Sequence, residues 1–447
     1  MKPTSLPRIA IAATVFSVLL LMALPKAHAE TETVLYSFCS VGGAVCNDGQ
    51  LPNGPLTIGW YGNFYGTTQD GGLYGDVFGL YPEPEGGCES GSNTGDGWCE
   101  FVLYSFCSVA NCADGEQPSG NLAFLNGGIN RPGNLYGTTY HGGANSNNVC
   151  EVIGSGFGSG CGTVFEIFPE PLSPPGCPSG TNGGNGWCEA VLYNFCSLSN
   201  CEDGTLPTGN LVADSAGNLY GTVGDGVFEL SPNGSGGWNE AVIYQPTAGL
   251  HAGLAIDAAG VLYGATSGNV FKLSFSQNQW VAENIHSFNG PPDGSDPNGP
   301  PAIDSVGNVY GTTYAGGSKN HGTVWKLIPV TKGKNKGTYT ETVLHSFTGA
   351  GAGEYPGGGV TLDSSGNVYS ATTSGGRLEC TLNVGCGTVL ELAASGTTYK
   401  YKLLWRFDGT DGGFPNSSPI LGSSGNLYGV TPAWGANDSG TVYELTP

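Results

Sequence analysis

The chain has 447 residues with 36 acidic and 14 basic side chains, so its formal net charge at pH 7 is −22. A protein this acidic repels phosphate backbones and anionic lipid headgroups, and we expect neither nucleic acid nor a membrane surface as a partner. Charged residues make up only 11% of the chain, while glycine contributes 78 residues. This composition, with its aromatic and β-branched side chains, favours short strands and tight turns over disorder.

The first 29 residues have the features of a secretory signal peptide. Lys2 and Arg8 precede an apolar run over residues 9–24, and Ala-His-Ala at 27–29 offers a cleavage site. A membrane anchor is the alternative, but the run is short of the roughly 20 apolar residues that a spanning helix needs. We expect cleavage after Ala29, export to the periplasm or the extracellular space, and a mature chain without a membrane span. Its net charge would be −25, from 36 acids and 11 bases.

Fourteen cysteines in an exported chain predict disulfides. The cysteines recur in pairs at shared positions: after Tyr-x-Phe, ahead of a Val-Leu-Tyr run, or just before Gly-Thr-Val. The predicted bridges are Cys39–Cys46, Cys88–Cys99, Cys107–Cys112, Cys150–Cys161, Cys177–Cys188, Cys196–Cys201 and Cys380–Cys386. A zinc site is disfavoured because no Cys-x-x-Cys occurs and the histidines are scattered.

From residue 31 onward the chain repeats one pattern seven times. The repeats centre on a motif that reads close to Asn-x-Tyr-Gly-Thr-Thr, at Tyr65, Tyr136, Tyr220, Tyr263, Tyr310, Tyr369 and Tyr428. Each repeat contains four short runs with strand character, which in the third repeat are 209–213, 218–222, 226–230 and 238–244. No run has the length and period of a helix.

The first two runs of several repeats are joined by an Asp-x-x-Gly turn. It occurs at Asp214, Asp257, Asp304 and Asp363. The glycine suits a positive φ, and the aspartate can accept backbone N–H bonds. A calcium loop is the alternative interpretation, and calcium is the one cofactor that the sequence raises.

Seven four-stranded units predict an all-β, seven-bladed β-propeller formed by residues 30–447 as a single domain. The last repeat ends with a third strand at 440–445, and residues 31–38 form an unassigned fourth strand. We expect this N-terminal strand to complete the last blade and close the ring.

The repeat resembles the GloVer tandem repeat of exported bacterial proteins. The resemblance rests on Asn-Leu-Tyr-Gly-Thr-Thr-x-x-Gly-Gly followed by Gly-Thr-Val-Phe-x-Leu, and it covers nearly all of the mature chain. It implies an exported, surface-associated repeat protein, and it brings no established activity and no catalytic residues.

Two repeated elements are expected on one face of such a propeller. The first is Asp-Gly-x-x-Pro-x-Gly at Asp48, Asp114, Asp203 and Asp293, with a partial copy at Asp411. Five carboxylates around a ring could hold a cation or a polyol, but an Asp-Gly before Pro is more often a turn.

The second element is the Thr-Thr-x-x-Gly-Gly loop, in which two positions vary between repeats. A repeat scaffold keeps its folding residues and varies its loop tips for binding. The candidate ligand-binding residues there are Asp70, Tyr140, His141, Tyr314 and Trp434. The aromatic rings suit stacking on sugars; Asp70 and His141 are weak candidates for acid–base chemistry. Neutral variation at exposed tips remains the alternative.

The loops also predict an uneven face. The third and fourth repeats have short links at 223–225 and 266–268, and the Asp-Gly element is lost near His251, which favours a groove on that side. Arg377 is a further ligand candidate for an acidic group, although an exposed arginine without a ligand is the simpler account. His286 and His345 replace a tyrosine of the outer strand, where packing is favoured over metal binding.

These features favour a secreted, monomeric binding module for an extracellular carbohydrate or a surface protein. A polysaccharide lyase or hydrolase that uses the same face is the alternative, and a structural envelope protein is a third. No metal-binding or nucleophile motif identifies an enzyme.

Overall fold

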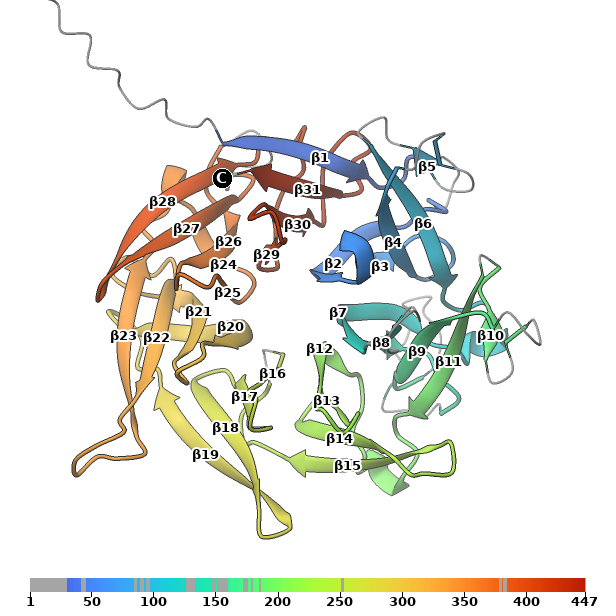
Figure 1. Cartoon of the computed structure of the whole chain (residues 1–447), viewed down its shortest axis with the longest axis horizontal. Coiled ribbons are helices and arrows are strands. Elements are labelled where there is room, and N and C mark those ends of the chain that lie inside the picture. Colours follow the sequence, from blue (N-terminus) through green and yellow to red (C-terminus); the bar gives the residue numbers. More distant parts are fainter. Residues whose placement is uncertain are drawn as a thin grey trace, which may run out of the picture.

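A computed structural model shows seven antiparallel sheets arranged around a central axis (Figure 1). The structure describes residues 30–41, 46–83, 87–88, 92–93, 97–125, 133–145, 150, 160–171, 176–177, 180–184, 186–250, 253–377, 380 and 384–446. The predicted signal peptide and His251 lie outside them. Within the described residues, no helix has the length and apolar character needed to cross a membrane.

Each sheet is one blade, with its first strand nearest the axis and its last at the periphery (Figure 1). Blade 1 contains β2 (Gln50–Ile58), β3 (Phe64–Asp70), β4 (Asp76–Pro82), β6 (Trp98–Ser105) and β5 (Ser92–Asn93). Blade 2 contains β7 (Glu116–Leu125), β8 (Asn134–His141), β9 (Thr163–Pro169), β11 (Trp187–Asn194) and β10 (Thr181–Asn182). Blade 3 contains β12 (Thr208–Ala213), β13 (Leu219–Val223), β14 (Gly226–Pro232) and β15 (Trp238–Tyr244).

The other four blades follow the same order. Blade 4 contains β16 (Ala255–Ile256), β17 (Leu262–Ala265), β18 (Asn269–Ser276) and β19 (Gln279–Ser287). Blade 5 contains β20 (Gly294–Ile303), β21 (Val309–Gly316), β22 (Thr323–Pro329) and β23 (Tyr339–Ser346). Blade 6 contains β24 (Glu354–Pro356), β25 (Thr361–Leu362), β26 (Val368–Ser374), β27 (Thr388–Ser395) and β28 (Thr398–Arg406). Short 3₁₀ turns occur at Trp60–Gly62, Ala110–Cys112, Ser199–Cys201 and Ala350–Ala352.

Blade 7 is built from both ends of the described part of the chain. It contains β29 (Ile420–Leu421), β30 (Leu427–Thr431), β31 (Thr441–Thr446) and, at the periphery, β1 (Thr31–Ser37). β1 pairs antiparallel with β31, from Thr31 opposite Thr446 to Ser37 opposite Thr441. The predicted seven-bladed propeller, with its last blade completed by the N-terminal strand, is confirmed.

All seven predicted disulfides are present. Each joins cysteines between 5 and 11 residues apart. Because such bridges persist in oxidising compartments, they favour a location outside the cytosol.

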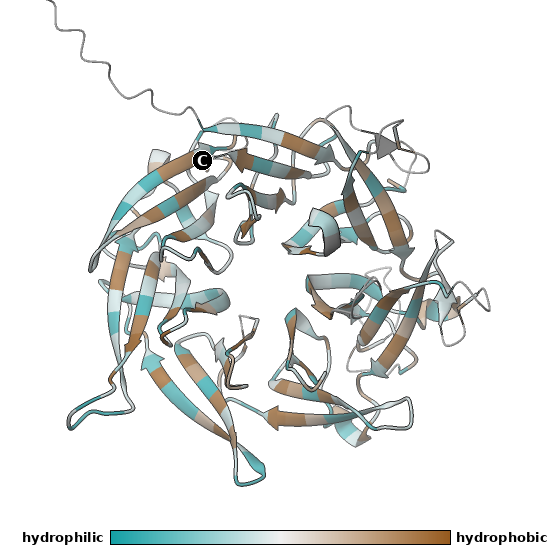
Figure 2. Ribbon diagram, viewed as in Figure 1, coloured by the Kyte–Doolittle hydropathy of each residue, from teal (hydrophilic) through white to brown (hydrophobic). Residues whose placement is uncertain are grey.

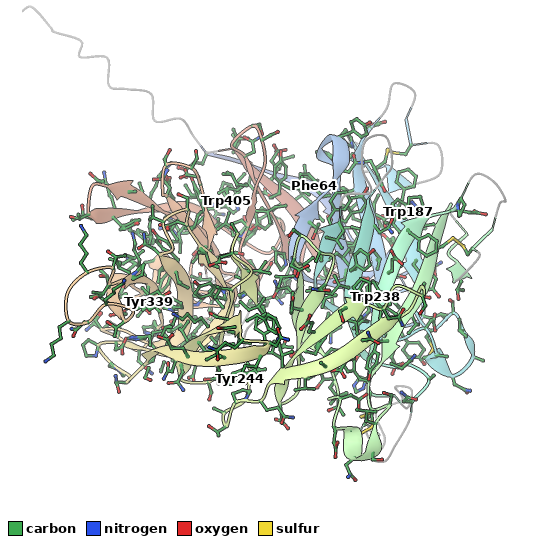
Figure 3. The ribbon with its side chains drawn as sticks, turned by 60° about the horizontal axis from the view of Figure 1, so that its bottom comes forward. Phe64, Trp187, Trp238, Tyr244, Tyr339 and Trp405 are labelled. Carbon is green, nitrogen blue, oxygen red and sulfur yellow. A yellow bond between two sulfur atoms is a disulfide. The ribbon has the colours of Figure 1, made fainter. Side chains whose placement is uncertain are left out.

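The core lies between neighbouring blades. Hydrophobic and hydrophilic residues alternate along the peripheral strands (Figure 2), as expected for sheets with one face against each neighbour. At the start of the outer strands of blades 2 and 3, Trp187 and Trp238 (Figure 3) each pack on the repeat tyrosine of the preceding blade. The ring centroids lie 6.3 Å apart for Tyr65–Trp187 and 6.5 Å apart for Tyr136–Trp238. The repeat tyrosine is therefore a contact between blades.

The glycine after that tyrosine makes room for an aromatic ring. In six blades it lies opposite an aromatic residue of the third strand, and a Cβ atom there would come within 3.0 Å of that ring: Gly66–Phe78, Gly137–Phe165, Gly221–Phe228, Gly264–Phe271, Gly311–Trp325 and Gly429–Tyr443. Blade 6 differs at both positions, since Ser370 lies opposite Leu390. The larger residue in strand two thus accompanies a smaller one in strand three.

This pairing predicts a non-additive effect on stability. Gly221→Ser alone should lower the free energy of unfolding by about 1–3 kcal/mol, because the new side chain overpacks against Phe228. Adding Phe228→Leu should recover part of that loss, as in the Ser370–Leu390 pair. Urea unfolding of both single variants and the double variant measures the coupling. Strictly additive losses would show that the two positions are independent.

Candidate functional site

A central cavity of about 520 Å³ lies on the axis where the first strands of all blades converge. We call the face onto which it opens the upper face. This face carries the links from the second to the third strand of each blade and from each outer strand to the next blade. Most of the cavity is lined by residues of the inner strands or of the segments next to them: residues 53–55, 119–121, 208–210, 253, 298–300, 357–359 and 416–418.

Glycines let these inner strands approach each other closely. A Cβ atom on Gly54 would lie 2.6 Å from the carbonyl carbon of Gly120, and one on Gly120 would clash with the carbonyl of Gly209. All three have a positive φ, between 77° and 86°. Only glycine adopts that backbone without strain and also leaves the space free.

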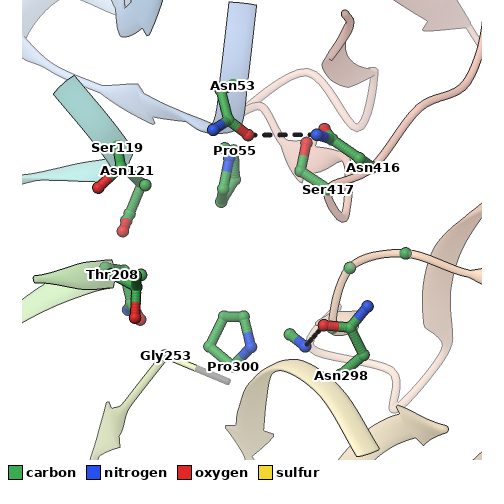
Figure 4. A pocket seen from close by; sticks show the side chains of 18 of the residues that line it. Asn53, Pro55, Ser119, Asn121, Thr208, Gly253, Asn298, Pro300, Asn416 and Ser417 are labelled. Carbon is green, nitrogen blue, oxygen red and sulfur yellow. Dashed lines mark hydrogen bonds between the residues drawn. The ribbon is translucent and has the colours of Figure 1, made fainter. Parts of the chain in front are cut away.

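The lining is polar but uncharged. Among the described residues that line the cavity, the side chains end in amides, hydroxyls or apolar groups, and none is acidic, basic or an imidazole. Asn416 donates through Nδ2 to Oδ1 of Asn53 across the junction of blades 7 and 1, at 3.2 Å (Figure 4). The Asn210 amide pairs with the backbone N–H and carbonyl of Leu254, both at 2.8 Å.

Three oxygen atoms of this lining accept no hydrogen bond from the described residues. They are Oδ1 of Asn121, Oδ1 of Asn416 and Oγ of Ser417. Ser417 is only 4% exposed, and its side chain lies beside that of Asn416 at the cavity (Figure 4). Buried polar atoms are normally paired, so these three are exceptions in the wall of the cavity, where protein atoms cover them.

The mouth of the cavity is formed by residues at the two variable positions of the Thr-Thr-x-x-Gly-Gly loops. Gln69, Tyr140, Tyr314 and Thr373 extend from the second strands of blades 1, 2, 5 and 6. Tyr314 is 41% exposed and stacks on Tyr355, with ring centroids 4.9 Å apart. Two of the predicted ligand-binding residues, Tyr140 and Tyr314, are thus brought to one cavity.

The other predicted site residues lie elsewhere and do not line it. Asp70 ends β3 opposite Gln50. His141 is buried, with its ring edge-on to Tyr140 at 4.6 Å, and burial lowers its pKa.

Two more predicted residues are placed in the links of blades 6 and 7. Trp434 packs into the core cluster that contains Cys380. Arg377 is half-exposed and forms an ion pair with Asp408, Nη1 to Oδ2 at 2.9 Å. Ligand roles for these four residues stay predictions.

The aspartates of the Asp-Gly loops join neighbouring blades. Asp48 accepts hydrogen bonds from the Tyr36 hydroxyl of blade 7 at 2.7 Å and from the Ser40 amide at 2.7 Å. A glutamate of the next outer strand lies near each loop aspartate; Glu100 and Glu189 are buried, and the other three are half-buried. The sets are Tyr36–Asp48–Glu100, Tyr104–Asp114–Glu189, Tyr193–Asp203–Glu240, His286–Asp293–Glu341 and Trp405–Asp411–Glu32. These contacts agree with a structural role for the loop aspartates.

At the junction of blades 5 and 6, other residues take the place of the aromatic residue, the aspartate and the glutamate. Between blades 5 and 6, Ala352 occupies the aspartate position and Tyr401 the glutamate position, and the Tyr401 hydroxyl donates to the Ala352 carbonyl at 2.8 Å. His345 stacks on Tyr401 at 4.5 Å, and burial lowers its pKa to about 4, in line with the predicted packing role.

The Asp-x-x-Gly turns show the predicted turn chemistry. In Asp214, Oδ1 accepts the backbone N–H groups of Ala216 and Asn218, both at 2.9 Å. Asp257, Asp304 and Asp363 make the equivalent pairs of bonds.

The sequence analysis missed the inner-strand amides as cavity residues. The signal in the sequence is an asparagine directly after the proline of an Asp-Gly loop, at Asn53, Asn298 and Asn416. It was overlooked because these short runs were assigned only to strands, and the convergence of seven first strands is a property of the ring.

No family model matches this chain, and no curated protein matches it. The GloVer-type resemblance therefore stays a prediction. Among solved structures the chain is similar to virginiamycin B lyase from Staphylococcus aureus, with a TM-score of 0.51 and 10% identity over 94% of this chain and 99% of that one. It is also similar to the extracellular domain of the one-component system BT4673 from B. thetaiotaomicron, with a TM-score of 0.48 and 8% identity over 93% and 40% of the two chains. At these identities the likeness concerns the propeller fold alone.

The buried glutamates predict that stability falls as pH rises. Burial, together with Asp114, raises the pKa of Glu189 to about 9, and burial with Asp203 raises that of Glu240 to about 7. In the unfolded chain these groups ionise near pH 4.5, so between that pH and the raised pKa the unfolded state is favoured progressively. Thermal unfolding should therefore show a melting temperature that falls from about pH 5 to about pH 9.

Glu189→Gln should flatten this dependence, because the amide cannot ionise. The exposed Glu202→Gln serves as the control and should leave the slope unchanged. An unaltered slope in the Glu189 variant would contradict the assignment of a protonated carboxyl to this junction.

Proposed function

We propose that this protein is a secreted binding module that holds an extracellular, uncharged carbohydrate in its central cavity. The observation that carries this proposal is the lining itself: neutral amides and hydroxyls below two tyrosines at the mouth. Carbohydrate hydroxyls both donate and accept hydrogen bonds, and amide side chains match them with both kinds of group. Tyrosine rings suit the apolar faces of sugar rings.

The negative net charge of the protein favours an uncharged ligand over an anionic one. The mature chain carries a net charge of −25, from 36 acids and 11 bases, and such a field repels anions. No described residue of the lining offers a positive charge that would offset this repulsion. A neutral polyol meets no such barrier and leaves no charge buried without a partner.

A lyase or hydrolase that uses the same cavity is favoured less. Either reaction needs a group that moves a proton at the reacting atom, and none of the described lining residues is a carboxylic acid, an imidazole or an amine. A surface protein as ligand, and a purely structural role, are outcomes of the test below.

Native affinity electrophoresis of residues 30–447 tests the proposal. The gels contain neutral polysaccharides such as β-glucan, mannan or starch, or anionic pectin, each with and without calcium. We expect retardation by a neutral polymer that does not require calcium. A cleared zone around the band would replace binding with an enzyme, and unchanged mobility in every gel would direct the search to protein partners.

Removing the tyrosines at the mouth should weaken binding. Tyr140→Ala and Tyr314→Ala should each lower the affinity for the retarding polysaccharide about tenfold, equivalent to about 1.4 kcal/mol. Tyr61→Ala is the matched control, since Tyr61 is 90% exposed and lies in the link between the first two strands of blade 1, on the opposite face. Equal effects of all three substitutions in the same gels would contradict the cavity as the site.

A further inference from the structure

The links around the mouth of the cavity differ greatly in length. In blades 3 and 4 the second and third strands are joined by residues 224–225 and 266–268 alone. The corresponding links in the other blades are residues 71–75, 142–162, 317–322, 375–387 and 432–440. The upper face is therefore lowest over two adjacent blades.

The residues that line the cavity also differ between the blades with short links and those with long links. Blades 1, 2, 5 and 6 each contribute a residue from the end of the second strand, whereas blades 3, 4 and 7 contribute only residues of the inner strands or of the segments next to them, namely 208–210, 253 and 416–418. Blade 7 carries the longer link of residues 432–440 on this face, so within the described residues the wall above the cavity is missing at blades 3 and 4. Tyr140 of blade 2 and Tyr314 of blade 5 stand on the two sides of this opening, because these blades flank blades 3 and 4 in the ring (Figure 1).

The short links are held down by backbone hydrogen bonds. Gly224 donates its N–H to the carbonyl of Thr205 at 2.9 Å, and Ser267 donates to the carbonyl of Gly249 at 3.1 Å. The side chains there are small, with glycine at 224 and 268. The opening is therefore built into the fold of these two blades.

We propose that the cavity takes the end of a linear, uncharged polysaccharide and that the rest of the chain leaves over blades 3 and 4, between Tyr140 and Tyr314. This inference rests on the proposed function. A cavity of about 520 Å³ has the size of a small-molecule site, which spans about 300–1,000 Å³. It holds only a short piece of a polymer, so a bound polysaccharide needs a way out, and the missing wall supplies it. The two tyrosines then contact the sugar ring that passes through the opening.

The test measures how affinity depends on chain length. Titration calorimetry uses uncharged glucose and mannose oligomers of one to six units with β-1,4, β-1,3 or α-1,4 linkages. We expect the oligomers of at least one series to bind at least tenfold more tightly than their monosaccharide. Blocking the opening with Gly268→Trp should remove that gain and leave binding of the monosaccharide unchanged.

The substitutions are chosen for a backbone that tolerates them. A Cβ atom on Gly268 meets nothing within 4 Å, and one on Gly224 meets only Thr205 at 3.5 Å or more. Neither glycine has a positive φ. Gly224→Trp is therefore an independent second block, and Ala436→Trp, in the exposed link of blade 7, is the matched control.

The outcomes separate the two proposals. If both blocked variants keep the gain with chain length, or if Ala436→Trp removes it, the exit over blades 3 and 4 is wrong while binding in the cavity stands. If the monosaccharide binds and longer oligomers gain nothing, the ligand is a small sugar and the inference fails. If no oligomer binds the unmodified protein, the proposed function itself fails.

Discussion

Closure of the ring by β1 is the constraint on which the rest of the structure depends. A blade with an open outer edge would leave backbone N–H and carbonyl groups unpaired, and β1 covers the edge of β31 along residues 31–37. Because β1 and β31 lie at opposite ends of the described part of the chain, their pairing ties the first blade to the last. The inner strands can converge only in a closed ring, so the central cavity is a consequence of this pairing.

Several contacts within and between blades are made by pairs of residues that change together from one repeat to another. Ser370 replaces glycine where the facing residue is Leu390 instead of an aromatic ring. Likewise, Tyr401 and Ala352 replace a glutamate and an aspartate at the junction of blades 5 and 6, and the Tyr401 hydroxyl donates to the Ala352 carbonyl. The first exchange keeps the packed volume similar, and the second gives that hydroxyl a partner, as close packing between blades requires.

The acidic groups and the cavity are kept apart. The loop aspartates bond to aromatic side chains of the preceding blade, and the buried glutamates beside them have a raised pKa because burial disfavours their charge. The inner strands instead present amides and hydroxyls. An acidic protein thus has an uncharged centre, and this separation is the physical basis for proposing a neutral ligand.

The sequence by itself determined the repeat, the number of blades, the closing strand and all seven disulfides. These follow from local features: strand-forming runs, turn residues and cysteines that recur at shared repeat positions. It also indicated Tyr140 and Tyr314, because variable positions in an otherwise constant loop are visible within one chain. The tertiary structure decided which of the loop residues face a common space. Only there does His141 prove to be buried, Arg377 to be paired with Asp408, and Asn121, Asn416 and Ser417 to meet around one cavity. These residues lie in different repeats, and their distances depend on how seven blades close around an axis, which no local pattern records.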